Sequence, residues 1–299
     1  MIKFGTGKTS LNVRTSGIPI LLFRELHIIC SCTAIMEPNM FFDLFLEYVD
    51  QHQSNFLAKE VASLGYSGAA IAYCATADEF TVSLNRKDRT SKEKSGTFSP
   101  PVILDEASTL KTTTGVPFKI FRRLSVVVSD PRIFHDLANH PTCKAFDIIS
   151  VSPTDEKMLQ QAIDDVNVDI IELDFTTKRC VSIKRKHARQ AEANGKFFEV
   201  CYRGALETPE ARAVFFANCR RLVGDLNPCD SGKLPDVVIM SSGLASSYLL
   251  KSPTELSFLA DLFGFPRQFS DRMFSVSSYQ ALQNSLAKRR TAKNAVQIL

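Results

Sequence analysis

The sequence lacks the features that mark several common classes of protein. No run of about eighteen apolar residues occurs, so we expect no membrane-spanning helix. No glycine-rich loop follows an expected strand, which argues against a dinucleotide-binding fold or a P-loop. No G-x-S-x-G segment supplies the nucleophile turn of an α/β-hydrolase. What remains is a chain of 299 residues, 44% of them hydrophobic, which can bury a full core as one barrel or as two small domains.

Histidine and closely spaced cysteine are also scarce. The eight cysteines are dispersed, and only Cys30 and Cys32 lie close together, at a spacing that fits neither a C-x-x-C motif nor a zinc knuckle. We interpret the cysteines as reduced, mostly core-filling thiols of a cytosolic or nuclear protein. A metal-dependent phosphoesterase barrel would need histidines at the ends of its strands. The five histidines of this chain all lie outside the expected strands. Asp50 and His52 are the nearest approach to a paired-ligand motif, and that signal is weak.

The first 39 residues lack any acidic side chain before Glu25 and carry little periodic hydrophobicity. Their basic composition, rich in serine and threonine, is one that mitochondrial transit peptides share. We expect residues 1–39 to be a disordered extension and residues 40–299 to form a single folded domain. A translation start placed upstream of Met40 and a transit peptide are alternative explanations of the extension.

From residue 40 onward, short apolar segments alternate with segments of helical character. The expected strands cover residues 41–48, 67–76, 119–129, 145–152, 171–175, 197–202 and 236–242. Helices are expected between most of them, including residues 55–64, 187–194, 208–222 and 253–263. This alternation predicts an α/β fold with a parallel sheet, and short helices with nearly eight strands favour a TIM-like barrel. Residues 274–277 are the only candidate for an eighth strand, so we expect an irregular or incompletely closed barrel.

Residues 77–118 interrupt the alternation. This stretch is rich in lysine, arginine, serine and threonine and contains the pair Pro100-Pro101. A structureless loop of this length is unusual inside a compact domain. We therefore expect an inserted surface loop that is at best partly ordered.

Charge is distributed unevenly along the chain. From residue 177 to the end, 19 Lys and Arg face 10 Asp and Glu, a balance of +9, whereas residues 140–176 carry 2 against 8, a balance of −6. This polarity favours a polyanionic partner over a small neutral substrate. An ordinary solvated face is the alternative explanation.

A basic cluster lies between an expected strand and an expected helix of the β-α-β unit at residues 169–202. Such a loop leaves the carboxyl end of its strand, the edge at which α/β proteins carry their sites. Lys184, Arg185, Lys186 and Arg189 lie between the strand end and the first turn of the helix. Backbone N–H groups at the start of a helix can help to hold a phosphate. The pattern therefore predicts a phosphate-binding surface.

Carboxylates within the expected strands invite an enzymatic interpretation; they are Asp43, Asp147, Glu172, Asp174 and Glu199. An unpaired buried charge is costly, so we expect each to pair with a nearby Lys or Arg or to lie at a solvent-facing rim. We accordingly predict no catalytic residue, no metal ligand and no cofactor.

Five stretches match one known family in order along the chain. They are FFDLFLEY at the start, RRLSVVVSDP at 122–131, FDIISVSPTDEKMLQQA at 146–162, the unit at 169–202, and DVVIMSSGLASSYLLKSPTELSFLADLFG at 236–264. Together they resemble the thirty-kilodalton protein subunit of ribonuclease P, which eukaryotes share with ribonuclease MRP. The resemblance covers residue 40 to about residue 292 and leaves out the extension and the long loop.

The resemblance implies a barrel of the polymerase and histidinol phosphatase type whose metal-binding histidines are gone. Where a metal-binding relative would carry H-x-H after the strand aspartate, this chain has Leu44, Phe45 and Leu46 after Asp43. The resemblance further implies an RNA-binding scaffold without activity of its own, in a nuclear and nucleolar complex whose RNA removes the 5′ leader of precursor tRNA. The implied partners are the catalytic half of ribonuclease P RNA, precursor tRNA, and other protein subunits, especially a small α/β-sandwich subunit. Sharing with ribonuclease MRP implies a role in ribosomal RNA processing as well.

By position, the family's basic residues correspond to Arg122, Arg123, Lys184, Arg212 and Lys251. Lys251 stands where the family usually has arginine, and lysine lacks the bidentate geometry of arginine toward phosphate. With the loop cluster and an arginine outside the apolar sector of the helix at 208–222, the predicted RNA-binding residues are Arg122, Arg123, Lys184, Arg185, Lys186, Arg189, Arg212, Arg220 and Lys251.

Two other functions stay open. A metal-dependent phosphoesterase barrel is disfavoured because so few histidines are present, none of them in an expected strand. A protein-interaction barrel without RNA contact is disfavoured by the balance of +9 from residue 177 onward.

Overall fold

The computed structural model describes residues 40–76, 110–113, 115–178, 180–227, 234–292 and 295–296. The chain divides into two units, residues 1–39 and residues 40–299, and the described residues all belong to the second. The expected extension at 1–39 and most of the expected loop at 77–118 lie outside the described residues. The end of that loop is described, and there Phe118 is buried in the core.

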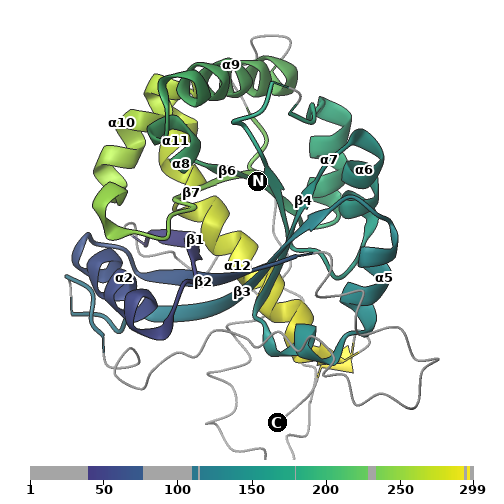
Figure 1. The fold of residues 1–299 in the computed structure, drawn as a ribbon, viewed down its shortest axis with the longest axis horizontal. Coiled ribbons are helices and arrows are strands. Elements are labelled where there is room, and N and C mark those ends of the chain that lie inside the picture. The colour runs from purple at the N-terminus through teal and green to yellow at the C-terminus, as the bar shows by residue number, and fades with distance from the viewer. Residues whose placement is uncertain are drawn as a thin grey trace, which may run out of the picture. The chain divides into compact units, whose positions relative to one another are not determined.

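Seven parallel strands form one sheet, and each strand pairs with the next along the chain (Figure 1). The strands are β1 (Phe42–Glu47), β2 (Gly68–Ala75), β3 (Lys119–Val128), β4 (Ile148–Pro153), β5 (Ile170–Leu173), β6 (Phe197–Cys201) and β7 (Val238–Ser241). Sequential parallel order is the topology of a barrel, so the predicted TIM-like α/β barrel is confirmed.

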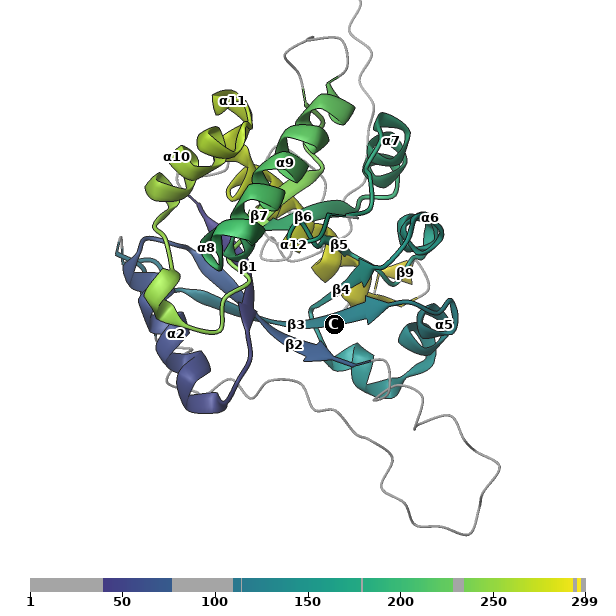
Figure 2. The same ribbon diagram turned by 45° about the horizontal axis from the view of Figure 1, so that its top comes forward.

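Helices surround the strands in both views (Figures 1 and 2). The helices are α2 (Gln51–Ser63), α5 (Arg132–Asn139), α6 (Glu156–Asp164), α7 (Arg185–Ala193), α8 (Arg203–Leu206), α9 (Pro209–Leu226), α10 (Pro253–Phe263), α11 (Arg267–Met273) and α12 (Val276–Arg290). Shorter elements are η2 (Pro141–Ala145), η3 (Ser247–Leu249) and the antiparallel pair β8 (Thr291–Ala292) and β9 (Ala295–Val296). Of the helices described, none is long and apolar enough to cross a membrane.

Polar side chains explain where two of these helices begin. Thr208 accepts the N–H of Ala211 at 3.1 Å and caps α9. Asp50 accepts the N–H of Gln53 at 2.8 Å and caps α2, which therefore begins at Gln51 rather than at the expected residue 55. The aspartate of the weak paired-ligand motif is thus a helix cap.

Among the described residues, the barrel closes between β7 and β1 with no further strand between them. Just past β7, the N–H of Gly243 donates to the carbonyl of Phe45, and the N–H of Glu47 donates to the carbonyl of Leu244, both at 2.9 Å. Residues 274–277 end α11 and begin α12, so the prediction of a weak eighth strand there is wrong. Phe274 contributes one hydrogen bond to the barrel, through its carbonyl. The expectation of an irregular barrel is met by direct bonding between the first and last strands.

The described cysteines are all free thiols. Cys143, Cys180 and Cys219 are buried, which confirms the prediction of core-filling thiols for these three. Cys201 is partly buried and Cys74 is exposed, so the described thiols are mostly, but not all, core-filling.

The amino-terminal end of the barrel interior is apolar. The buried side chains of this layer are Phe42, Leu44, Ala70, Ile148, Ile170, Phe197 and Ile239, with Phe121 partly buried beside them. Helix α12 runs across the strands (Figure 1) and buries Ala281 and Leu282 in the layer. The ring of Tyr279 stacks on Phe42 with 5.6 Å between centroids. Helix α12 therefore covers the apolar end of the barrel.

A buried carboxylate fastens α12 to the barrel. Asp169, which immediately precedes β5, is 2% exposed. It accepts from Lys288 Nζ at 3.1 Å, from Arg289 Nη2 at 2.6 Å and from the N–H of Ile149 at 2.9 Å. One side chain thus joins α12 to both β4 and β5.

Replacing Asp169 with alanine removes the carboxylate partner of two cations and the acceptor of the Ile149 N–H. We expect Asp169→Ala to lower the free energy of unfolding by about 2–4 kcal/mol in urea titrations, because buried donors lose their partner. The control is Glu192→Ala on exposed α7, expected to change stability by no more than about 0.5 kcal/mol. Equal stability of the two variants would show that Asp169 does not fasten α12.

Candidate nucleic-acid interface

A polar layer lies next to the apolar layer inside the barrel. On five strands, a polar residue follows an inward apolar residue by two positions; these residues are Arg123, Ser150, Glu172, Glu199 and Ser241. Alternate residues of a strand face the same side, so all five point into the barrel, one step nearer the carboxyl ends of the strands. This is the end at which barrel enzymes place their chemistry.

Arg123 is fully buried, and all five of its N–H donors are used. Nε donates to Ser150 Oγ at 2.9 Å. Nη1 donates to the carbonyl of Leu44 at 2.7 Å and to Glu199 Oε1 at 2.8 Å. Nη2 donates to Glu172 Oε1 at 2.7 Å and to Glu199 Oε2. Burial by itself lowers the pKa of Arg123, but the carboxylates of Glu199 and Glu172 outweigh it and raise the pKa above its usual value.

Arg123 has no donor left for a phosphate and no exposed atom to offer one. Its inclusion among the predicted RNA-binding residues is therefore wrong. Glu172 and Glu199 are paired with this arginine, as expected for strand carboxylates. In the part of the chain that the structure describes, no group of three or more His, Cys, Asp and Glu is arranged to hold a metal ion.

Asp43 is a second buried carboxylate, on β1. Its Oδ1 accepts the N–H groups of Phe45 and Ser242, both at 3.1 Å, whereas Oδ2 has no hydrogen-bond partner among the described residues. Burial raises the pKa of Asp43 to about 6, although the hydrogen bonds from Ser242 and Phe45 oppose the rise. The expectation that each strand carboxylate pairs with a cation or lies at a solvent-facing rim is therefore wrong for Asp43.

Four predicted RNA-binding residues come together at the start of α7. Lys184 is the N-cap, Arg185 and Lys186 are in the first turn, Arg189 is one turn further, and all four are exposed. The N–H groups of Arg185 and Lys186 have no acceptor among the described residues. The first turn carries no acidic side chain, so three cations lie at the positive end of the helix dipole. An anion bound there would relieve the repulsion among the cations and the repulsion between the cations and the helix dipole.

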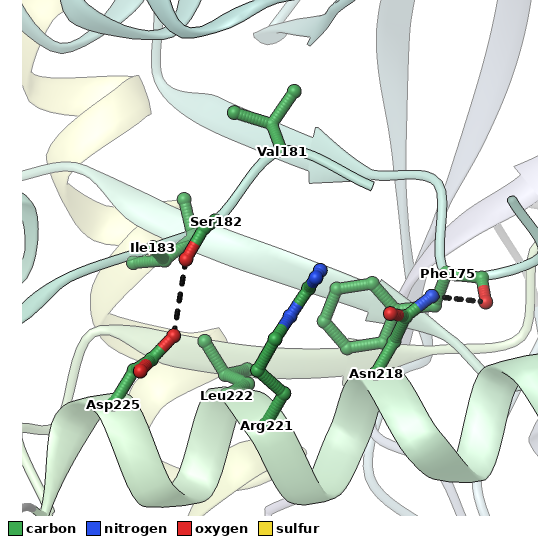
Figure 3. A pocket seen from close by; sticks show the side chains of 8 residues that line it. All are labelled: Phe175, Val181, Ser182, Ile183, Asn218, Arg221, Leu222 and Asp225. Carbon is green, nitrogen blue, oxygen red and sulfur yellow. Dashed lines mark hydrogen bonds between the residues drawn. The ribbon is translucent and has the colours of Figure 1, made fainter. Parts of the chain in front are cut away.

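Helix α9 holds the loop that leads into this turn (Figure 3). Asn218 Nδ2 donates to the carbonyls of Phe175 and Thr177, both at 3.0 Å. The hydroxyl of Ser182 donates to Asp225 Oδ2, also at 3.0 Å. The loop from β5 to α7 is therefore attached to α9 near both of its ends.

Arg221 completes this row on α9. Its Nη2 donates to the carbonyl of Cys180 at 3.0 Å, between the attachments made by Asn218 and Asp225. Residues 218, 221 and 225 follow the helical spacing that places side chains on one face. Figure 3 shows all three side chains directed from α9 toward the loop, around a small hollow lined also by Val181.

The other predicted contacts are dispersed. Arg212, in the first turn of α9, donates through Nε to the carbonyl of Ala205 at 2.8 Å and remains exposed. The side chain of Arg220 passes beside Gly264 at the end of α10. Arg122 is exposed on β3, toward the opposite end of the barrel from the start of α7.

Lys251 is held by two buried tyrosines. The hydroxyl of Tyr66 donates to the carbonyl of Lys251 at 2.9 Å, and the N–H of Lys251 donates to the hydroxyl of Tyr202 at 3.3 Å. Lys251 precedes α10 at the carboxyl edge of the strands, the edge that also carries the start of α7. Its backbone position is thus fixed while its side chain is partly exposed.

Residues 40–290 of the chain match the family model described as RNase P subunit p30. The chain belongs to the RNase P subunit p30 family. It is 29% identical over 212 residues to ribonuclease P protein subunit p30 of Mus musculus, covering 70% of this chain and 71% of that protein. It is 31% identical over 172 residues to ribonuclease P protein subunit drpp30 of Dictyostelium discoideum, covering 57% of this chain and 44% of that protein.

A third relative, protein GAMETOPHYTE DEFECTIVE 1 of Arabidopsis thaliana, is 28% identical over 183 residues, covering 61% of this chain and 30% of that protein. The chain therefore spans less than half the length of the Dictyostelium and Arabidopsis relatives. A solved structure, the cryo-EM structure of archaeal ribonuclease P with mature tRNA, contains a chain with a TM-score of 0.58 at 15% identity. The match covers 86% of this chain and 97% of that one. This likeness shows a shared fold.

For this member of the RNase P subunit p30 family, sequence patterns did not show that Arg221 bonds to the loop before α7. Helical periodicity placed Arg212, Arg220 and Arg221 outside the apolar sector of α9 but did not show which neighbour each one faces. The spacing of Asn218, Arg221 and Asp225 was the available signal, because three polar residues on one helix face indicate a polar neighbour.

We expect Arg123→Met to lower the free energy of unfolding by about 3–5 kcal/mol, because Glu172 and Glu199 would stay buried without a counter-charge. Arg123→Lys should restore little of this loss, since an ammonium cannot reproduce five donors in a plane. Urea titration of both variants measures the effect. A fully stable Arg123→Met protein would mean that the polar layer does not hold the barrel together.

Asp43 should make stability depend on pH. Its folded pKa of about 6 lies above the usual 3.8, so between about pH 4 and pH 6 the folded state binds more protons, and stability falls as the pH rises. Relative to its value below about pH 4, the free energy of unfolding is lower by about 3 kcal/mol once the pH exceeds about 6. Asp43→Asn keeps the acceptor and removes the charge, so it should be more stable than the wild type at pH 7 and similar at pH 4. A difference that is the same at both pH values would contradict this assignment.

Proposed function

We propose that the chain is a non-catalytic protein subunit of ribonuclease P that binds RNA through the basic first turn of α7. The family match over residues 40–290 carries the proposal. The mouse and Dictyostelium relatives are named as ribonuclease P protein subunits, which supports it. In this role the RNA removes the 5′ leader of precursor tRNA, and the chain supports the RNA.

The partners in this proposal are ribonuclease P RNA, precursor tRNA and other protein subunits, including a small α/β-sandwich subunit. A relative in Saccharomyces cerevisiae is named as a ribonuclease P/MRP protein subunit and is 24% identical over 173 residues, which supports sharing with ribonuclease MRP. Such a subunit would act in the nucleus and nucleolus, and through ribonuclease MRP in ribosomal RNA processing.

The surface at the start of α7 suits a phosphate backbone. Lys184, Arg185 and Lys186 are exposed, adjacent and unopposed by any acidic side chain in their own turn. Neutralising these charges with a polyanion releases condensed counterions, which makes binding strong and dependent on salt. Of the other predicted contacts, Arg189 extends this surface by one turn, and Arg212 and Lys251 lie along the same edge of the barrel.

The metal-dependent phosphoesterase is less well supported, because the described barrel interior is filled by Arg123 and its partners where an enzyme of that kind would hold its ions. A barrel that binds only proteins is also less well supported, because it does not account for the exposed cations in the first turn of α7, which has no acidic side chain.

The test is the triple variant Lys184→Glu, Arg185→Glu and Lys186→Glu. We expect its affinity for ribonuclease P RNA to fall by orders of magnitude, and the log–log slope against salt to flatten by roughly 0.7–0.9 for each phosphate that the variant no longer neutralises. Filter binding at several salt concentrations measures both quantities, and thermal denaturation should show little change.

The matched control changes three exposed cations elsewhere, as Arg132→Glu, Lys144→Glu and Lys157→Glu. It alters the net charge by the same amount, so it separates a local contact from a general electrostatic effect. Equal losses of affinity in the two triple variants would reject the α7 turn as the binding surface.

A further inference from the structure

The loop from β5 to α7 is hydrogen-bonded to α9, so it connects the basic first turn of α7 with the facing side of α9. The described cations on this continuous area are Lys178, Lys184, Arg185, Lys186, Arg189 and Arg221, and all of them are exposed. We call this area the α7–α9 surface. We propose that the α7–α9 surface binds the phosphate backbone of double-stranded RNA and that Arg221 is one of its phosphate contacts. The proposal rests on the proposed function and names the kind of RNA structure that this surface takes.

The charge of the surface is predominantly positive. The carboxylates within the loop and along the facing side of α9 are Asp174 and Asp225, and each already accepts a hydrogen bond from a neighbour. Asp174 accepts from the hydroxyl of Thr176 at 2.6 Å, and Asp225 from that of Ser182 at 3.0 Å. The one acidic residue of α7, Glu192, lies in its last turn, away from the cluster. Glu156 of the neighbouring helix α6 also interacts electrostatically with His187 in the first turn of α7. Six cations therefore face four carboxylates, and the cations occupy the end of α7 with free backbone N–H groups.

Arg221 is oriented for an external ligand. One Nη2 bond to the carbonyl of Cys180 fixes the direction of the guanidinium, and the side chain remains exposed beside the hollow in Figure 3. A guanidinium held in this way loses little conformational freedom when it binds a phosphate. Arg221 can thus extend the row of phosphate contacts from α7 onto α9.

The α7–α9 surface offers no platform on which a base could stack. The large exposed hydrophobic side chains among the described residues lie on other parts of the chain; they are Val49, Phe56, Val116, Val127, Val166, Tyr248, Phe258 and Leu262. Proteins that bind single-stranded RNA combine basic grooves with aromatic side chains on which bases stack. Double-stranded RNA keeps its bases stacked internally and is recognised through phosphates, 2′-hydroxyls and shape. A basic surface without aromatic side chains therefore fits a duplex.

The surface is also held in a fixed shape. Asn218 and the Ser182–Asp225 pair attach the loop to α9 through hydrogen bonds that carry no net positive charge. Fixed cations match phosphates that are themselves at fixed spacing, as along a duplex, better than those of a flexible strand. Asn218 and Ser182 are thus positioning residues for the contacts made by α7 and Arg221.

The first experiment measures binding of the full chain to a generic RNA duplex and to a single strand of the same length. We expect the duplex to bind more tightly, with affinity independent of its sequence. Arg221→Gln should weaken duplex binding by about tenfold at low salt and flatten the salt slope by an amount that corresponds to about one phosphate. The matched control is Arg132→Gln, because Arg132 is an exposed arginine on α5, outside the α7–α9 surface; it should leave both quantities unchanged.

The second experiment tests positioning. Asn218→Ala and Ser182→Ala remove no charge, so they should weaken duplex binding without changing the number of counterions released, and hence without changing the salt slope. Hydrogen exchange at residues 176–183 should rise in both variants, and Ser182→Thr, which keeps the hydroxyl, should restore binding. Loss of thermal stability with unaltered duplex affinity would show a purely structural role.

The outcomes separate this inference from the proposed function. A wild-type chain that binds neither the duplex nor ribonuclease P RNA would reject the proposed function. Binding to ribonuclease P RNA with no preference for duplex over single strand, or equal effects of Arg221→Gln and Arg132→Gln, would overturn only the present inference. Unchanged RNA affinity in Arg221→Gln, with loss of a protein subunit on co-purification, would assign the surface to a protein partner and overturn it too.

Discussion

The guanidinium of Arg123 connects most of the barrel from within. From β3 it reaches the Leu44 carbonyl of β1, Ser150 of β4, Glu172 of β5 and Glu199 of β6, and Glu199 in turn accepts from Ser241 of β7 at 2.6 Å. A seven-stranded barrel with a short junction between β7 and β1 gains from such internal connections. The same network depends on every member, because a buried charge that loses its partner is more costly than no charge at all.

Charges inside and outside the barrel have opposite roles. Inside, two carboxylates surround one arginine whose donors are all used. Outside, the first turn of α7 carries cations and no acidic side chain of its own, and its first N–H groups have no acceptor among the described residues. The charges around Arg123 are satisfied within the chain, whereas the cations at the start of α7 have no acidic side chain in their own turn. The family to which the chain belongs gives this contrast a functional meaning.

The fold was largely predictable because short-range hydrophobic periodicity indicates the alternation of strands and helices. Closure of the barrel was not, because it depends on two backbone hydrogen bonds near Gly243 that no side-chain pattern records. The α7 cluster was predictable from its place between a strand and a helix. The assignment of Arg123 to RNA binding was wrong, and the bond of Arg221 to the loop before α7 could not be foreseen, for one shared reason. Whether an arginine faces the barrel interior, a loop or solvent is set by neighbours distant in sequence, and each of these arginines has an equally basic neighbour.

Helix α12 follows all seven strands in the chain, yet it covers the apolar layer to which six of them contribute buried side chains. During synthesis on the ribosome, Phe42 and the other residues of that layer emerge long before their cover does. Until α12 leaves the ribosome, the apolar end of the barrel stays uncovered. Over the same interval, Asp169 lacks Lys288 and Arg289, the cations that pair with it in the folded protein. Chaperone binding and aggregation of interrupted chains should accordingly concentrate at this one end of the protein.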